Sequence, residues 1–227
     1  MGGSIPKQFV RLGDRPILAH TLSAVANLPS ISIIFLVVAE AHIADAGEVV
    51  AEWSRRRASN GKRRTVPEIS ILGGGAERMD SVYNGLRKLP AECDWVMIHD
   101  AVRPFASERL IHAVWEGAVA TGACIAAIPS ADTVKRARDG VVLETLSRDE
   151  IWLVQTPQVF RKQIVVQAYE KAFAAGWTGT DDASFVERIG VPVSIVRGEG
   201  TNIKVTTPED LEWAEWFLSA RAGRGGL

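Results

Sequence analysis

The chain has few cysteines, no surplus of charge of either sign and no long apolar run. Its 227 residues include only two cysteines, Cys93 and Cys124, which are too few for a disulfide framework and lack the spacing of metal ligands, so we expect buried free thiols. Lys and Arg (26) nearly balance Asp and Glu (27), which argues against nucleic acid as the main partner. The longest apolar runs have the length of strands, so we predict no membrane span and no signal peptide, and we expect a cytoplasmic protein.

Several motifs of familiar enzyme classes are also missing. The sequence holds no GxxxxGK[ST] loop and no complete GxGxxG. Its four histidines are scattered and suggest no Ser-His-Asp arrangement. For His99, a structural role at the end of a strand is favoured over that of a base. Any recognition of phosphate must therefore come from a few individually placed groups.

What the sequence does contain is an alternation of short apolar strands and amphipathic helices. The chain is 47% hydrophobic and 23% charged, as is usual for a globular enzyme, and its length suits a single α/β domain over residues 1–227. The expected strands are 31–39, 68–72, 95–99, 124–128 and 193–196, and the expected helices are 17–26, 41–57, 77–89, 107–120, 161–175, 181–189 and 208–220. This alternation predicts a doubly wound, mostly parallel sheet.

Residues 132–160 interrupt this alternation. The segments 133–136 and 141–145 flank Arg138-Asp139-Gly140, which is a strong signal for a β-hairpin. Two interpretations remain open from the pattern alone. The hairpin is either an arm that contacts another chain or a surface excursion without such a role.

The clearest candidate site follows the apolar run 95–98. In an open α/β sheet, ligands bind outside the carboxyl ends of the strands, and here Asp100 and Arg103 occupy that position. Asp100 suits a divalent cation, and the planar guanidinium of Arg103 suits a phosphate. Alternatively, Asp100 caps the next segment and Arg103 pairs with it on the surface. The strand-end position and the stiffening effect of Pro104 favour a functional site.

Two further segments are candidates for ligand contacts. The glycines 73–75 follow an expected strand and open a helix whose first turns carry Arg78 and Ser81. Such a loop lets a ligand approach the backbone, although a tight turn also needs glycine. Lys204 is either a solvated surface lysine or a half-buried one beside a phosphate. Lys7 by itself is no more than a terminal charge.

Taken together, these segments resemble the 2-C-methyl-D-erythritol 4-phosphate cytidylyltransferases of the non-mevalonate isoprenoid pathway. So many short matches in the same order, through nearly the whole chain, make coincidence implausible. The matching segments are Pro6-Lys7-Gln8, Gly74-Gly75-Ala76-Glu77-Arg78 with Ser81-Val82, His99-Asp100-Ala101-Val102-Arg103-Pro104, Asp132-Thr133-Val134-Lys135, Arg148, Trp152 with Gln155-Thr156-Pro157-Gln158, Thr180-Asp181-Asp182-Ala183-Ser184 and Asn202-Ile203-Lys204-Val205-Thr206.

The resemblance implies a Rossmann-like nucleotidyltransferase that joins CTP to methylerythritol phosphate and releases pyrophosphate, with Mg²⁺ or another divalent cation. It implies that Lys7 and Lys204 contact the CTP phosphates and that Asp100 serves the metal and the nucleotide. The nucleotide pocket would include Gly74, Gly75, Arg78, Ser81 and Ala101, and the acceptor would contact Arg103, Thr133, Arg148, Thr156 and Thr180. Lys7, Lys204 and Arg148 are the expected catalytic residues.

The resemblance further implies a homodimer in which the hairpin arm, within residues 132–160, reaches the other subunit's site. Thr133, Arg148 and Thr156 would then complete the acceptor site in trans.

Two departures from the family pattern concern the nucleotide. Ala76 stands where many members carry an acid or another polar residue, and alanine cannot make that contact. The family opens with a strand and a loop of the type A-A-G-x-G-x-R-M, whereas this sequence starts at Met1, at the methionine that closes that loop. We therefore expect the first strand and the glycine-rich loop to be missing from the sequence, through a misplaced start rather than a true truncation, and CTP binding to be weak without them.

Two alternative functions remain open from the sequence. One is a cytidylyltransferase for ribitol 5-phosphate, which shares the sheet and the CTP site. The other is an inactive dimeric scaffold, an interpretation motivated by the missing loop. Arg148, Thr156 and Thr180 favour methylerythritol phosphate as the acceptor.

Overall fold

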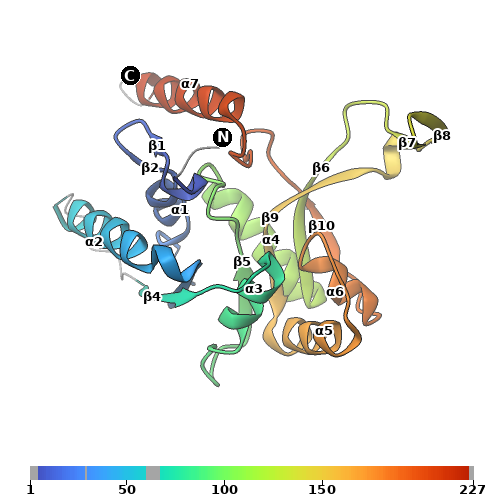
Figure 1. The fold of residues 1–227 in the computed structure, drawn as a ribbon, viewed down its shortest axis with the longest axis horizontal. Helices are drawn as coiled ribbons and strands as arrows, with labels where there is room; N and C mark the ends of the chain where they lie inside the picture. The colour runs from blue at the N-terminus through green and yellow to red at the C-terminus, as the bar shows by residue number, and fades with distance from the viewer. Residues whose placement is uncertain (1–4, 29, 60–66, 225–227) are drawn as a thin grey trace. The chain divides into compact units, whose positions relative to one another are not determined.

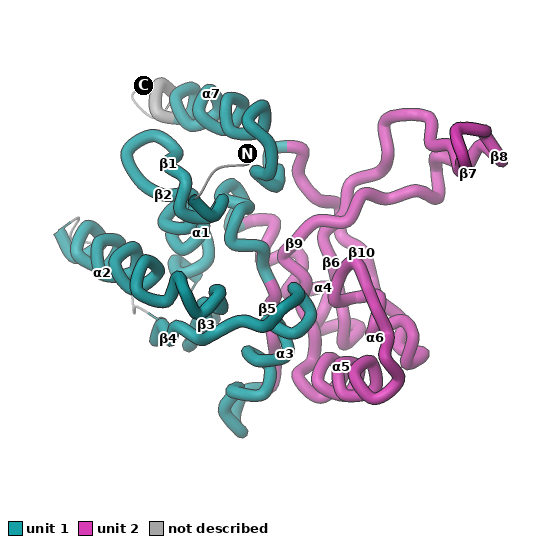
Figure 2. The backbone as a smooth tube through the Cα atoms, in the orientation of Figure 1, with its two compact units in different colours: residues 1–93, 99–108, 201–227 teal, residues 94–98, 109–200 magenta. Residues whose placement is uncertain are grey.

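The computed structural model describes residues 5–28, 30–59 and 67–224 (Figure 1). The chain divides into two compact units (Figure 2). Unit 1 comprises residues 1–93, 99–108 and 201–227, and unit 2 comprises residues 94–98 and 109–200. Met1, on which the expectation about the missing strand and loop depends, lies outside the described residues, and the single domain over residues 1–227 stays a prediction.

Unit 1 contains a pair of parallel strands, β3 (Ile33–Val38) and β4 (Glu68–Gly73). A short 3-10 helix, Glu40–His42, and then α2 (Ile43–Ser59) follow β3 along the chain. Two strand residues pack with residues of α1 (Ile17–Val25) and α2 in one buried cluster, whose members include Leu36, Val38, Leu18, Leu22 and Trp53. The β-branched and apolar residues of these strands therefore face helices, as expected for a parallel pair.

A second buried cluster of unit 1 holds the ends of several segments together. It joins β1 (Arg11–Leu12), which pairs with β2 (Arg15–Pro16), to the loop after residue 99 and to α7 (Pro208–Arg224). The Phe105 ring lies 4.9 Å from Phe217 and 6.2 Å from Trp213, measured between centroids. Aromatic contacts of this kind anchor the loop that carries Asp100 and Arg103 to α7.

Unit 2 is built on a four-stranded sheet in the order β10 (Ser194–Arg197), β6 (Ala123–Pro129), β9 (Trp152–Arg161) and β5 (Trp95–Ile98). β10 runs parallel to β6, but β9 is antiparallel to both β6 and β5. The sheet is therefore mixed: β10, β6 and β5 run in the same direction, as predicted for a mostly parallel sheet, and of these four strands only β9 runs against the others.

β9 overlaps the predicted hairpin arm, residues 132–160, at all of its positions except the last, Arg161. Its central residues, Gln155-Thr156-Pro157-Gln158, are polar or proline and look unlike a buried strand. Ile125 pairs with Gln158 and Ala126 pairs with Gln155, so Thr156 and Pro157 form an irregularity between the two pairs. A bulge accommodates proline within a sheet, so the unusual residues and the strand are compatible.

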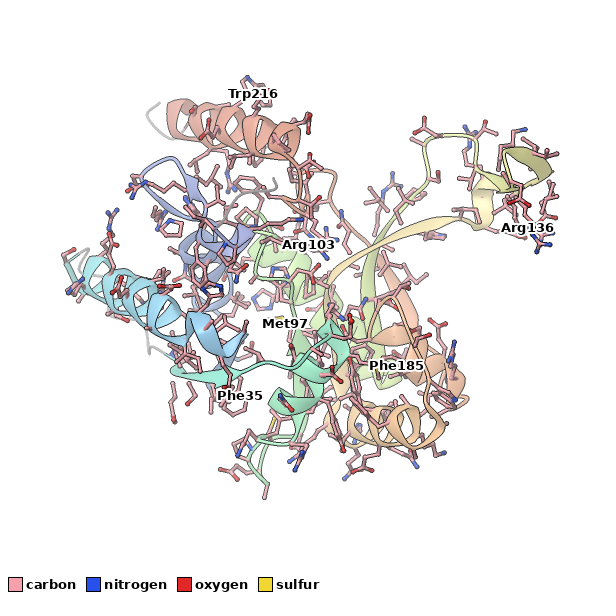
Figure 3. All side chains as sticks on the ribbon, in the orientation of Figure 1. Phe35, Met97, Arg103, Arg136, Phe185 and Trp216 are labelled. Carbon is pink, nitrogen blue, oxygen red and sulfur yellow. The ribbon has the colours of Figure 1, made fainter. Side chains whose placement is uncertain are left out.

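Three helices cover the sheet of unit 2, namely α4 (Glu108–Thr121), α5 (Lys162–Ala175) and α6 (Ala183–Arg188). Val114 and Ala118 of α4 are fully buried in one cluster with Cys124 and Val159 of the sheet. The Tyr169 ring of α5 lies 5.1 Å from Phe185 of α6, which is labelled in Figure 3. No helix of the described residues is long and apolar enough to cross a membrane.

The predicted hairpin is present in unit 2 and is formed by β7 (Lys135–Arg138) and β8 (Val141–Thr145). Asp139 and Gly140 both have positive φ, 50° and 79°, which matches the two-residue turn that the Asp-Gly pair predicts. All residues of both strands are exposed, and the hairpin stands away from the sheet of its own unit (Figure 1). The structure therefore confirms the hairpin, while its role in a dimer stays a prediction.

Candidate active site

Asp100 is the centre of a cluster of charged side chains in unit 1. Its Oδ2 atom lies 3.2 Å from Lys204 Nζ and 3.2 Å from Arg103 Nε, and its Oδ1 atom lies 3.6 Å from Arg78 Nε. The structure thus brings together four of the predicted site residues from three separate segments of the sequence. Three cations around one carboxylate leave an excess of positive charge, which suits a site for phosphates.

The charged residues of this cluster are unequally buried. The Asp100 and Arg103 side chains are 12% and 10% exposed, whereas those of Lys204 and Arg78 are 43% and 39% exposed. Arg103 also donates from Nη1 to the carbonyl oxygen of Asn202 over 2.8 Å, so its guanidinium is held on two sides. Arg103 is labelled in Figure 3, in the loop that follows β5. Buried arginines of this kind are positioned by their partners before a ligand binds.

The ionisation of Asp100 reflects two opposing effects. Burial by itself raises the pKa of the carboxyl, but the charges of Lys204, Arg78 and Arg103 outweigh burial and hold the pKa below its ordinary value of 3.8. Asp100 is therefore a carboxylate at neutral pH, and it can interact with cationic side chains and with a cation that accompanies a ligand.

This lowered pKa predicts an acid-dependent contribution to stability. The contribution of Asp100 is fully present above its ordinary pKa of 3.8 and is lost as the pH falls below it, because the folded state must then take up a proton. We expect the free energies of unfolding of the wild type and Asp100→Asn to differ by a constant amount above about pH 5 and to converge below about pH 4. Urea titrations over this range measure the difference, and a gap that stays constant down to about pH 3 would contradict the prediction.

The glycine loop after β4 is closed by Ser81 of α3 (Arg78–Leu86). Gly75 N donates to Ser81 Oγ over 3.1 Å, and a Cβ atom on Gly74 would lie 2.7 Å from the same oxygen. Glu77 and Asp80 form a capping box at the start of α3, so carboxylates already occupy this helix terminus. The loop is thus better suited to a neutral ring than to a triphosphate, and its role in the nucleoside pocket stays a prediction.

The tight packing at Gly75 predicts a strong effect of a single methyl group. A Cβ atom there would lie 2.2 Å from Asp80 Cβ, so Gly75→Ala forces the loop and the capping box apart. We expect a loss of about 1–3 kcal/mol in the free energy of unfolding, measured by urea denaturation. Gly200→Ala is the matched control, because a Cβ atom there meets no atom within 4 Å. Equal effects of both substitutions would contradict the steric explanation.

Lys7 belongs to a short 3-10 helix, Lys7–Phe9, and its side chain is exposed. Among the described contacts, none joins Lys7 to the cluster around Asp100. Ala101 does belong to the same loop as Asp100, and its carbonyl oxygen accepts a hydrogen bond from Thr21 Oγ1. Ala101 is therefore adjacent to the cluster around Asp100, whereas no described contact links Lys7 to it.

The remaining predicted residues lie in unit 2. Thr133 is exposed between β6 and β7, and Arg148 is exposed in the 3-10 helix Arg148–Glu150, where its Nη1 atom lies 3.4 Å from the carbonyl oxygen of Ala131. Thr156 is only 5% exposed, in β9, and Thr180 is exposed just before α6. These four residues are contributed by four different segments of the unit.

Gln158 holds the segment after Thr180, a role that no local sequence pattern indicates. Its fully buried amide donates from Nε2 to Asp181 Oδ2 over 3.0 Å and accepts from Ala183 N over 3.1 Å. Asn202, which binds Arg103 through its carbonyl oxygen, was likewise recognised only as part of a matching segment. Both roles depend on pairs of residues distant in sequence, which local patterns do not reveal.

The family model and the similar proteins that match this chain all carry the same description. The sequence model of IspD, 2-C-methyl-D-erythritol 4-phosphate cytidylyltransferase, matches residues 1–220. The chain is 43% identical over 225 residues to the protein of that name from Syntrophus aciditrophicus, covering 99% of this chain and 92% of the relative. It is also 43% identical over 222 residues to the one from Geotalea uraniireducens, covering 97% and 91%.

Solved structures show the same relationship. The crystal structure of 4-diphosphocytidyl-2C-methyl-D-erythritol synthase from Anaerococcus prevotii has a TM-score of 0.83 and 32% identity, over 93% of each chain. That of 2-C-methyl-D-erythritol 4-phosphate cytidylyltransferase from Thermus thermophilus has a TM-score of 0.76 and 29% identity, over 94% of each chain. The fold is thus the α/β nucleotidyltransferase fold of these enzymes.

Proposed function

The chain belongs to the 2-C-methyl-D-erythritol 4-phosphate cytidylyltransferase family, and from this premise we infer that it is an enzyme that transfers a cytidylyl group from CTP to 2-C-methyl-D-erythritol 4-phosphate. The products are 4-diphosphocytidyl-2-C-methyl-D-erythritol and pyrophosphate. The observation that best supports this reaction is the cluster of Lys204, Arg103 and Arg78 around Asp100. Both substrates are small phosphates in aqueous solution, and we place the reaction in the cytoplasm.

The reaction brings two anions together. An oxygen of the acceptor phosphate attacks the α-phosphorus of CTP, and the bond from that phosphorus to the bridging oxygen of the β-phosphate breaks, so that pyrophosphate leaves. The acceptor phosphate is ionised near neutral pH and needs no base. Burial lowers the pKa of His99 to about 4, so its imidazole is uncharged near neutral pH. Catalysis then rests on positioning and on neutralisation of charge.

The proposed roles divide among the charged residues of unit 1. We assign Lys204, with Lys7, to the phosphates of CTP, and Arg103 to the phosphate of the acceptor. The exposed Lys204 ammonium adapts to a flexible triphosphate as a point charge, whereas the buried, fixed fork of Arg103 matches a phosphate held in one orientation. The proposed nucleoside pocket is formed by Gly74, Gly75, Arg78, Ser81 and Ala101. Thr180 of unit 2 is assigned to the acceptor.

The donor set fits a divalent cation shared between protein and substrate. Mg²⁺ is usually held by one or two carboxylates together with substrate phosphates. The described residues contain no group of three or more His, Cys, Asp or Glu side chains arranged for a metal ion, so a site made of protein ligands alone is not formed among them. We propose that Asp100 is the protein ligand and that Mg²⁺, when bound with CTP, neutralises charge on the phosphates.

Exposed apolar residues of unit 2 support a homodimer. Val141, Val142 and Leu143 of β8 are 64%, 56% and 50% exposed, and Leu153 in the first half of β9 is 51% exposed. Apolar residues gathered on an exposed segment are typical of an interaction surface. We propose that the hairpin binds a second copy of the chain and that Thr133, Arg148 and Thr156 contribute to the acceptor site of that copy.

Turnover with alternative acceptors tests the proposed function. Pyrophosphate release is measured with CTP and either methylerythritol 4-phosphate or ribitol 5-phosphate, and we expect release with the first acceptor only. Release with ribitol 5-phosphate alone would overturn the choice of acceptor. The absence of turnover with both acceptors, together with the absence of binding of labelled CTP, would support an inactive scaffold instead.

A further inference from the structure

Every carbonyl of the loop 100–103 accepts a hydrogen bond within unit 1. Asp100 O accepts from Arg103 N over 3.0 Å, and Val102 O accepts from Val205 N over 2.9 Å. The other two carbonyls are bound by side chains. Ala101 O accepts from Thr21 Oγ1 over 2.8 Å, and Arg103 O lies 3.1 Å from His99 Nε2. The backbone of this loop is therefore fixed at each residue.

The chemistry of the His99 contact defines the state of the ring. A carbonyl oxygen only accepts, so Nε2 carries the hydrogen and donates it to Arg103 O. The bond runs from the residue at the end of β5 to the last residue of the loop, and it closes the loop upon itself. This leaves the backbone of Arg103 little freedom, while its side chain reaches Asp100 and Asn202.

Thr21 acts on the opposite half of the loop and comes from a separate element. It is 4% exposed in α1, and its hydroxyl lies closer to Ala101 O, at 2.8 Å, than to Ile17 O of its own helix, at 3.3 Å. A threonine inside a helix usually returns its hydrogen bond to the helix backbone. Here the shorter bond goes instead to the loop, 80 residues away in sequence.

We propose that His99 and Thr21 are positioning residues for the two halves of this loop, His99 setting Arg103 for the acceptor phosphate and Thr21 setting Ala101 for the nucleotide. The proposal rests on the function proposed above, because it uses the roles given there to Arg103 and Ala101. Neither side chain touches a substrate. Each side chain forms a hydrogen bond to a backbone carbonyl of the loop. These bonds hold the loop in one conformation before the two anionic substrates bind.

Paired variants and steady-state kinetics with both substrates test the proposal. His99→Leu removes the donor, and we expect it to raise the KM for methylerythritol 4-phosphate about tenfold while the KM for CTP stays within about twofold. His99→Gln places an amide nitrogen near the position of Nε2 and restores the KM. Thr21→Val, of equal shape, raises the KM for CTP instead, and Thr21→Ser restores it. Equal changes in both KM values, or no rescue by the conservative variants, would overturn the proposal.

Two further measurements separate this proposal from other failures. If His99→Leu does not fold, His99→Asn replaces it, because the shorter amide of asparagine does not reach Arg103 O. The proposal then requires that His99→Asn raises the KM for the acceptor and that His99→Gln leaves this KM unchanged. In an Arg103→Ala background, His99→Leu should add no further rise. An unchanged acceptor KM in Arg103→Ala alone would overturn the proposed role of Arg103, whereas an effect of Arg103→Ala without one of His99→Leu would overturn only the positioning role.

Discussion

Lys204→Ala is expected to lower kcat/KM by on the order of 100- to 1,000-fold without unfolding the protein. The ammonium lies 3.2 Å from Asp100 Oδ2 in a cluster where two anionic substrates are proposed to meet, so its loss removes charge stabilisation where charge develops. The side chain is 43% exposed, so its truncation leaves no buried cavity. Steady-state kinetics together with a thermal melt monitored by circular dichroism measures both effects.

Arg103→Ala is the companion variant and should differ from Lys204→Ala in stability. We expect a similar loss of turnover and in addition a lower melting temperature, because the Arg103 side chain is only 10% exposed and its removal leaves the Asn202 carbonyl without this donor. Lys171→Ala, an exposed lysine of α5, controls for loss of a positive charge elsewhere and should keep wild-type rates. Wild-type rates in both Lys204→Ala and Arg103→Ala would refute the site.

The second large effect concerns two inactive variants that restore each other. Arg148→Ala and Lys204→Ala are each expected to be nearly inactive, and a mixture of equal amounts should regain about a quarter of wild-type activity after subunit exchange. If Arg148 serves the partner's site, each mixed dimer has one site with both residues intact and one with neither. Statistical mixing makes about half of the dimers mixed, which gives the expected fraction.

The control for this experiment is a mixture of two variants of the same site. Lys204→Ala mixed with Arg103→Ala should remain inactive, because both residues belong to unit 1 and are assigned to one subunit's half of the site. Exchange is verified by mass spectrometry of differently tagged subunits. Confirmed exchange without recovery in the Arg148→Ala mixture would rule out the arm acting in trans.

The sequence predicts those parts of the fold that local patterns encode. Helices and parallel strands were placed to within a few residues by their periodicity, and the Asp139-Gly140 pair specified its hairpin turn through two positive φ angles. β9 was missed because Gln155, Thr156 and Pro157 break the apolar pattern, while the pairing with β5 and β6 that stabilises the strand is distant in sequence. Tertiary context therefore outweighed local composition at this strand.

In the candidate site, too, some residues can be predicted from local sequence patterns and others only from tertiary contacts. Asp100 and Arg103 could be proposed from the sequence because they follow the end of a strand, whereas the ion pair between Lys204 and Asp100 is seen only in the structure. Thr21 was not recognisable, since a threonine on an apolar helix resembles any core residue until its bond to Ala101 O is seen. Residues that touch a ligand leave local signals, whereas residues that hold them in place are found only from the structure.

The two halves of β9 link folding to self-association. Trp152, Leu153 and Val154 at its start are 37%, 51% and 42% exposed, while the residues from Gln155 to Phe160 are buried. If a second copy covers the exposed half, it binds only the folded strand, and mass action then adds the free energy of association to that of folding. The stability of unit 2 would therefore be a property of the protein concentration as well as of the chain.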